Sequence, residues 1–377
     1  MEHSFLAFLL VLPLAYANGT NDVSKAIATL VGSGVTNYRA AILWGTVWTI
    51  LGAGASAFVA SAMVKTFSQG LIQTGTIIQP GVALAILTGA MLWVLFASRT
   101  GLPVSTTHAL TGAIVGTGLM SFPGEALIWS AIVKKIALPL LLSPFLALTV
   151  SVIIHPVVRQ LAARWEGTCL CVMPASRALV AIDGRGGIKT LFQTTSFGKP
   201  IVAVPSQCNR AGLQGLVVGL DSIHWISSGM ASFARGTNDA PKIVAMLLLG
   251  ATTAVWPSVS SQLAAFGGVA LAMGLGSYVG GLRVTELLAE KVTRMNHTEG
   301  LSANLTTSSL VLVSGTLGLP VSTTHISSSA IIGIGLLKGL KEVSWTTVRD
   351  MVLAWIATLP AAALLACLTY LIFSRFL

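Results

Sequence analysis

Two short motifs each occur twice in this chain, and the two copies of both motifs are separated by the same distance. The four segments are ANGTNDVSK at 17–25, ARGTNDAPK at 234–242, and GLPVSTTH at 101–108 and at 318–325. In both pairs the second copy begins 217 residues after the first. A shared offset of this kind indicates an internal duplication. We therefore divide the chain into two homologous halves, 1–161 and 212–377.

The amino-acid composition shows the environment in which these halves fold. Hydrophobic residues make up 54% of the chain and charged residues only 9%, whereas about a quarter of the residues in soluble domains are charged. Six apolar stretches approach or exceed the roughly 20 residues that a membrane-spanning helix needs. They are 39–64, 80–98, 137–158, 213–234, 256–281 and 343–374. Because they lack the polar–apolar alternation of barrel strands, the sequence predicts an all-α polytopic membrane protein.

A polar segment, 162–211, separates the two halves. Several β-forming runs surround the turn sequence DGRGG, and they predict a small insert of short strands. From Arg159 to Arg210 there are seven Lys or Arg residues against two acidic residues. Since basic residues concentrate on the cytoplasmic side of membrane proteins, we expect the insert to lie in the cytoplasm.

The charge distribution also predicts the topology of the halves. We expect both termini outside, a re-entrant helical hairpin over 80–120, and an odd number of crossings before the insert. The second half is then an inverted copy of the first, with a second hairpin of its own. This arrangement places 14 basic residues inside and four outside, in agreement with the positive-inside rule. The prediction is a multi-pass protein of the plasma (inner) membrane.

The GLPVSTTH motifs combine helix-ending and helix-starting residues. Gly and Pro end one helix, and the hydroxyl residues cap the next, whose N-terminus attracts an anion. Two copies that approach from opposite sides could hold one tetrahedral oxyanion between them. The candidate substrate ligands are Ser105, Thr106, Thr107, Ser322, Thr323 and Thr324. The alternative is simple capping, but a cap needs one hydroxyl rather than three.

The GTND motifs offer the opposite chemistry. In inverted-repeat transporters, broken helices meet near the bilayer midplane and supply ligands there, so we expect a helix break at each motif. The candidate ligands for Na⁺ are Asn21, Asp22, Asn238 and Asp239, and the two acids could instead carry a proton or contact the substrate. The alternative is an ion pair between each acid and the lysine three residues on, Asp22 with Lys25 and Asp239 with Lys242.

The first GTND motif follows an apolar run that could also be read as a signal peptide. Ala15-Tyr16-Ala17 has the small-x-small form of a cleavage site. However, the second copy of the motif lies deep inside the chain, where no signal peptidase site could serve. We therefore expect LPLAYANGTNDVSK to be a retained helix that breaks at 18–21.

The paired NGTND, RGTND and GLPVSTTH motifs resemble the signatures of the inorganic phosphate transporter (PiT) family, and the resemblance covers essentially the whole chain. It implies an inverted-repeat fold with two re-entrant hairpins, phosphate uptake coupled to Na⁺ or H⁺, and usually a homodimer in the lipid membrane. By similarity, the six hydroxyl residues bind phosphate, while the Asn and Asp residues of the GTND motifs hold Na⁺ and contact the substrate. One departure is Arg235, which stands where the first copy has Asn18.

Other functions are weighed against this one. An intramembrane hydrolase could use Ser105 with His108, but it would have no need of a duplicated site, so we expect no enzyme, no cofactor and no nucleic-acid partner. A passive anion channel and a sulfate permease of the same fold remain alternatives. His108 and His325 fit packing or hydrogen-bonding roles better than ligand roles. Three thiols, those of Cys169, Cys171 and Cys208, make a weak metal site, and we expect them to be reduced.

Overall fold

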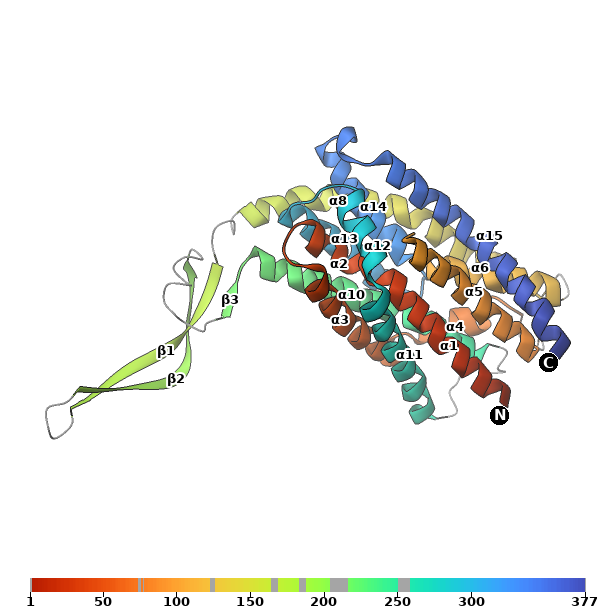
Figure 1. The fold of residues 1–377 in the computed structure, drawn as a ribbon, viewed down its shortest axis with the longest axis horizontal. Helices are drawn as coiled ribbons and strands as arrows, with labels where there is room; N and C mark the ends of the chain where they lie inside the picture. Colours follow the sequence, from red (N-terminus) through yellow and green to blue (C-terminus); the bar gives the residue numbers. More distant parts are fainter. Residues whose placement is uncertain are drawn as a thin grey trace.

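The helices pack into an elongated bundle, and a β-sheet projects from one end of it (Figure 1). The computed structural model describes residues 2–73, 76, 78–122, 126–163, 169–182, 188–203, 216–249 and 258–376, and gives only the backbone for 2–7, the strands and 376. The first helix begins and the last helix ends at the end of the bundle away from the sheet (Figure 1). The two chain ends therefore lie at one end and the sheet at the other.

The first half consists of helices that agree with the predicted apolar segments. They are α1 (Glu2–Asp22), α2 (Ser24–Gly32), α3 (Tyr38–Val59), α4 (Ser61–Gln69), α5 (Pro80–Thr100), α6 (Thr106–Ser121), α7 (Trp129–Ala131) and α8 (Leu138–Ala163). A π-helical turn, η1 (Ile132–Ala137), joins α7 to α8. The predicted segment 39–64 is divided between α3 and α4 at Ala60.

The second half repeats this order. Its helices are α10 (Leu220–Ala245), α11 (Val259–Gly280), α12 (Leu282–Glu286), α13 (His297–Thr316), α14 (Thr323–Lys338) and α15 (Trp345–Phe376), with the short turns η2 (Met246–Leu248), η3 (Leu287–Lys291) and η4 (Leu340–Glu342). Both ends of α14 lie 217 residues after the corresponding ends of α6. The offset found in the motifs thus extends to whole helices.

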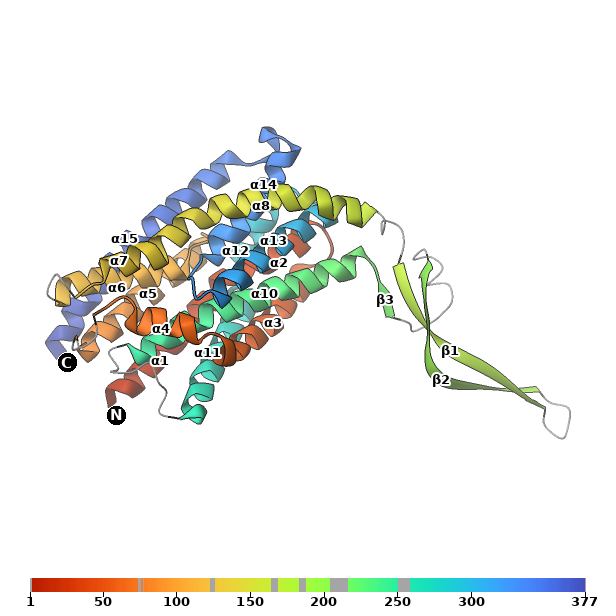
Figure 2. The same ribbon diagram turned by 180° about the vertical axis from the view of Figure 1, so that it is seen from behind.

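The two halves interlock. Helix α1 packs against α11, and its counterpart α10 packs against α3; in the same way α6 packs against α15, and α14 against α8. Each of these contacts joins one half to the other, and each has its counterpart with the halves exchanged. The helices of the two halves are consequently intermixed in the bundle, as seen from behind in Figure 2.

Five helical segments in the described part of the chain are long and apolar enough to cross a membrane. They are Tyr38–Val59, Pro80–Thr100, Trp129–Ala163, Val259–Gly280 and Trp345–Arg375. In α5, 61% of the most apolar stretch is buried, against 28% in the segments that contain α8 and α15. The outer helices expose large apolar side chains such as Phe145 and Ile356. These faces suit lipid, whereas α5 lies inside the bundle.

The expected helix breaks at the GTND motifs are wrong. Helix α1 continues through Asp22, and Val23 between α1 and α2 keeps helical angles, with φ −59° and ψ −35°. Helix α10 runs through the second motif without interruption. The motif glycines serve close packing instead: a Cβ at Gly19 would overlap the backbone of α11, and one at Gly236 would lie 2.6 Å from the carbonyl oxygen of Thr49 in α3. Contact with a neighbouring helix, which local sequence does not reveal, explains these glycines.

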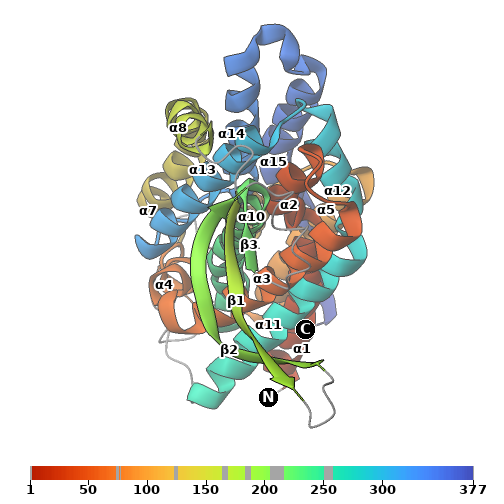
Figure 3. The ribbon, with the colours of Figure 1, turned by 90° about the vertical axis from the view of Figure 1, so that its left-hand side faces the viewer.

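The insert contains two long strands rather than several short ones. Strands β1 (Cys169–Ile182) and β2 (Ile188–Ala203) pair antiparallel, and the short β3 (Leu216–Val218) adds to the other edge of β1. The predicted apolar segment 213–234 is therefore helical only from Leu220, because β3 occupies its beginning. In the view from the sheet end, the sheet stands in front of α10 (Figure 3).

Candidate functional site

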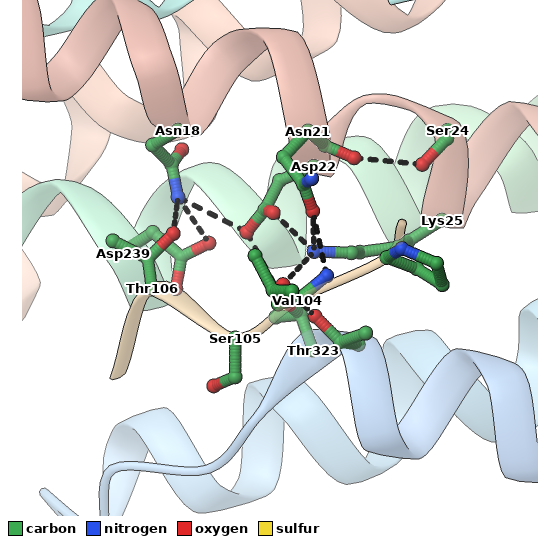
Figure 4. Close-up of polar contacts among 12 residues, drawn as sticks. Asn18, Asn21, Asp22, Ser24, Lys25, Val104, Ser105, Thr106, Asp239 and Thr323 are labelled. Atoms are coloured by element: carbon green, nitrogen blue, oxygen red, sulfur yellow. Dashed lines mark hydrogen bonds and ion pairs between the residues drawn. The ribbon is translucent and has the colours of Figure 1, made fainter. Parts of the chain in front are cut away.

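Each GLPVSTTH motif forms the turn between two packed helices, α5 with α6 and α13 with α14. Gly101 and Gly318 have φ values of +79° and +66°, a conformation that glycine adopts without a steric penalty. After a short extended segment, Ser105 and Ser322 accept hydrogen bonds at 3.3 and 3.1 Å from backbone N–H groups three residues on. The serines thus have the capping role that the sequence offered as the alternative, and Ser105 points away from the nearby acids (Figure 4).

The tips of the two turns contact each other. The Thr324 hydroxyl donates a hydrogen bond to the Val104 carbonyl at 2.6 Å, and the Thr107 hydroxyl donates to the Val321 carbonyl at 3.3 Å. The two bonds are counterparts, because Thr324 and Val321 lie 217 residues after Thr107 and Val104. The fold therefore brings the two copies of the motif together, as the sequence predicted for a shared site.

The GTND acids lie beside these tips, each paired with the lysine three residues on. Asp22 forms an ion pair with Lys25, and Asp239 with Lys242 at 3.1 Å. All four side chains are at most 3% exposed. The i, i+3 pairing that we considered as the alternative is present in both copies.

Each lysine ammonium also contacts two oxygens besides its acid. One is a main-chain carbonyl of a hairpin tip, and the other is a side-chain oxygen. These acceptors are Val104 O at 3.1 Å and Asn21 Oδ1 at 3.3 Å for Lys25, and Val321 O at 3.1 Å and Thr107 Oγ1 at 2.7 Å for Lys242. An ammonium group has three N–H donors, so three oxygens satisfy each lysine (Figure 4).

Asn18 joins the two acids, and the sequence did not identify it as a site residue. Its Nδ2 lies 3.0 Å from Asp22 Oδ2, 3.3 Å from Asp239 Oδ2 and 3.0 Å from Thr106 Oγ1 (Figure 4). The Thr323 hydroxyl approaches the same Asp22 oxygen at 3.5 Å. The only available signal was the position of Asn18 at the start of NGTND, since its partners come from three separate helices.

The two motif asparagines hold the hairpin tips. Asn21 donates from Nδ2 to the Leu102 carbonyl at 2.9 Å and accepts from the Val104 N–H at 3.1 Å. Asn238 donates to the Val321 carbonyl at 3.3 Å and to the carboxylate of the next residue at 2.8 Å. Within the described residues the Oδ1 atoms of Asn238 and Asn18 have no hydrogen-bond partner. Amide oxygens on the GTND helices are thus free in this buried cluster.

Arg235 is buried next to the acids. Its Nη2 donates to the Thr49 hydroxyl and lies 3.3 Å from the Ser277 hydroxyl. Its Nε and Nη1 atoms find no partner in the described part of the chain, although both Asp22 and Asp239 interact electrostatically with it. A buried guanidinium with unused donors is suited to binding an anion.

The histidines that follow the tips lie against each other. The rings of His108 and His325 are 4.8 Å apart, and His325 also lies against Trp355 at 4.2 Å. The Nδ1 atom of His325 is 3.4 Å from the Leu140 carbonyl. These are packing and hydrogen-bonding environments, as expected. The hydroxyl of Ser105 meets the backbone N–H of His108, in the manner of a cap rather than of a nucleophile with its base.

The remaining candidates are outside the cluster. The side chains of Cys169, Cys171 and Cys208 lie outside the described residues. Among those that are described, no group of three or more His, Cys, Asp and Glu side chains could hold a metal ion. The cluster itself consists of charges, amides and hydroxyls supplied by both halves of a membrane bundle, and such an arrangement suits binding and release of a small ion.

Comparison with known proteins identifies one family. The sequence pattern of the phosphate transporter family matches residues 18–366, which include both copies of both motifs. The chain is 27% identical to a candidate phosphate permease of Pyrococcus abyssi, over 97% of this chain and 96% of that protein. It is equally identical to a protein of Bacillus subtilis named a probable low-affinity inorganic phosphate transporter, over 98% and 96% of the two chains.

A solved structure has the same fold. It is titled the sodium-dependent phosphate transporter, and it superposes with a TM-score of 0.75 over the full length of both chains. Its sequence is 22% identical to this one. The arrangement of helices described above is therefore shared with a known transporter structure.

Proposed function

The chain belongs to the phosphate transporter family, and from this membership we propose that it is a secondary active transporter that imports inorganic phosphate by symport with Na⁺ or H⁺. The family and the named relatives are transporters and permeases, which confirms the resemblance and the expectation that the chain is not a hydrolase. In this proposal phosphate binds between the two hairpin tips, at the hydroxyl residues 105–107 and 322–324.

The charge of the buried cluster carries the proposal. Its ionisable members at the GTND motifs are Asp22, Lys25, Arg235, Asp239 and Lys242, all at most 2% exposed. With three basic and two acidic groups ionised, the cluster has one net positive charge. An uncompensated charge is costly inside a protein and more so inside a membrane. A bound monoanion such as dihydrogen phosphate would neutralise it.

The donors for such an anion are close by. We propose that Thr107 and Thr324 turn from the opposite carbonyls to phosphate oxygens when the substrate binds, and that Arg235 supplies its unused N–H groups. Phosphate at neutral pH keeps an O–H that can donate to Asp22 or Asp239, whereas sulfate has none. A site with buried acceptors discriminates against a substrate that leaves them unpaired, so the two acids favour phosphate.

Coupling to a cation is required by the direction of transport. An anion that enters a cell moves against the negative interior, so uptake needs another driving force. The sequence-based candidates for cation ligands, Asn21, Asp22, Asn238 and Asp239, all lie in the cluster beside the proposed phosphate position. A cation there would share the movement of the substrate.

The repeated helices support alternating access. We propose that the halves 1–161 and 212–377 are inverted repeats, that α5 with α6 and α13 with α14 are re-entrant hairpins, and that one group of helices moves against the other. The equivalent contacts between the halves support this, because they relate two copies by exchange. The position of the sheet opposite both chain ends (Figure 1) supports termini outside and a cytoplasmic insert, 162–211.

The surroundings of the transporter follow from the same argument. The exposed apolar faces of α8 and α15 support contact with lipid, and we place the protein in the plasma (inner) membrane. Assembly as a homodimer is part of the proposal on the basis of family resemblance.

Uptake of ³²P-phosphate into proteoliposomes tests this function. Na⁺ and pH gradients are imposed separately, with sulfate as a competitor. We expect uptake that exceeds equilibration under at least one gradient and that excess sulfate leaves unchanged. Flux that ignores both gradients would identify a passive channel, and strong inhibition by sulfate would identify a sulfate permease.

The acids provide the matching site test. Asp22→Asn and Asp239→Asn should reduce uptake at least about 100-fold, because removing one partner of a buried ion pair leaves a lysine uncompensated. Asp350→Asn, at an exposed position beside Arg349, is the control. Normal coupled uptake by either buried variant would show that the site is wrongly assigned.

A further inference from the structure

The two lysines occupy the oxygen ligands that the sequence assigned to a free cation. Each ammonium lies against a carboxylate of a GTND motif, a carbonyl of a hairpin tip and one further side-chain oxygen. Carboxylate, carbonyl and amide oxygens are the hard ligands that also coordinate Na⁺ at broken helices of transporters. The same oxygens therefore serve a tethered cation in this chain.

The arrangement is built twice. Lys25 and Lys242 are 217 residues apart, and so are their acids and the two tip carbonyls, those of Val104 and Val321. Only the third oxygen differs: Lys25 uses Asn21 of its own helix, whereas Lys242 uses a threonine from the other half. Two equivalent sites with the same filled ligands are difficult to explain as one local accident of packing.

Nothing in the described residues supplies replacement ligands from the motif backbone. Both GTND segments are helical, so their carbonyls take part in the helices instead of facing the cluster. The cluster already holds three basic groups against two acids, and a free Na⁺ would increase this excess of positive charge. Coulomb repulsion at short range in a low-dielectric site opposes such binding.

We infer that Lys25 and Lys242 are built-in cations that hold both cation positions of the GTND motifs and exclude Na⁺ from Asp22 and Asp239. Phosphate uptake then does not require Na⁺, which leaves the proton as the coupling ion. This inference rests on the proposed phosphate transport. The solved sodium-dependent transporter shares the fold, and the lysines would determine the cation specificity of this chain.

The test compares the whole protein with lysine variants in proteoliposomes. ³²P-phosphate counterflow, with equal phosphate on both sides, is measured in NaCl and in choline chloride. The variants are Lys25→Asn and Lys242→Asn, which replace the ammonium by an amide oxygen. The control is Lys65→Asn, the same change at an exposed lysine. Binding of ²²Na⁺ to the wild-type protein in detergent is measured in parallel.

We expect wild-type counterflow to be equal in the two salts and wild-type ²²Na⁺ binding to be absent at the sites. Each buried variant should lose activity in choline and regain it in NaCl by about tenfold or more, a change that corresponds to about 1.4 kcal/mol. The control should behave as the wild type. These results together would establish the lysines as the resident cations.

Three results would overturn the inference. The first is wild-type counterflow that requires Na⁺. The second is stoichiometric ²²Na⁺ binding to the wild type that Asp22→Asn removes, a measurement that does not depend on the folding of lysine variants. The third is a folded lysine variant that NaCl does not restore. Absence of wild-type counterflow in both salts would instead contradict phosphate transport itself, so the two failures are distinguishable.

Discussion

At the residue scale, the difference between Asn18 and Arg235 has the largest electrostatic effect. These residues occupy the same position in the two halves, yet Asn18 bridges both acids while Arg235 adds a charge and two unused donors. Without Arg235 the acids and lysines would balance. The duplication has therefore produced a site that is nearly symmetric in its geometry and asymmetric in its charge, and an anion is attracted by the asymmetry.

Arg235→Leu tests this role. The substitution removes the excess positive charge and the unused donors, so the phosphate concentration for half-maximal counterflow should rise about tenfold or more, since charge-assisted contacts contribute roughly 1.5–3 kcal/mol. The measurement is the phosphate dependence of counterflow. Arg349→Leu, at an exposed arginine beside Asp350, should leave it unchanged. An unaltered phosphate dependence in Arg235→Leu would separate the arginine from substrate binding.

At the scale of elements, glycines determine how the GTND helices approach their neighbours. Gly19 on α1 faces α11, and Gly236 on α10 faces α3, so both glycines lie at contacts between the halves. Helix packing in membranes depends on such small residues because they let backbones come close together. The GTND motif thus combines a packing residue with a charged pair two turns or less away, and the close contact fixes where that pair lies.

Alanine at these positions should be destabilising. A Cβ at Gly19 would lie 2.8 Å from the backbone nitrogen of Ser277, and one at Gly236 would lie 2.6 Å from the carbonyl oxygen of Thr49. Overpacking of this kind costs about 1–3 kcal/mol, which a lower Tm of the purified protein would show. The controls are Gly54→Ala and Gly267→Ala, helical positions in α3 and α11 with open space. Equal Tm values for all four variants would contradict the packing role.

At the scale of the whole molecule, the fold joins the halves so that neither has a complete site. The hairpin tip of each half accepts hydrogen bonds from the other half, and α1 and α10 pack mainly on helices of the opposite copy. A movement of one group of helices against the other must therefore alter the site itself. This coupling of site and overall arrangement is what alternating access requires.

The proposed topology has a direct test. In a background where all four cysteines are replaced by serine, Ser374→Cys near the end of α15 should react with a membrane-impermeant maleimide in intact cells. Lys341→Cys, which the positive-inside rule places in the cytoplasm, should react only after permeabilisation. Both positions are exposed. Labelling in the reverse pattern would show that the protein is inserted in the opposite orientation.

The amino-acid sequence by itself determined the features that depend on local chemistry. The ends of α5 and the start of α6 follow from a glycine that adopts positive φ and a serine that caps a helix, and the same residues act in α13 and α14. The constant offset predicted two copies of every helix contact. The low charge content predicted a membrane protein, because the solvent of the chain selects its composition.

Only the tertiary structure decided the features that depend on neighbours from the other half. Gly19 suggested a broken helix until α11 proved to lie against it, and the lysines had no known acceptors until the tip carbonyls of Val104 and Val321 were located. Asn18 became a site residue through partners on three helices. Local sequence specifies backbone preferences, but the occupant of a buried ligand set is determined by groups distant in the chain, which only packing brings together.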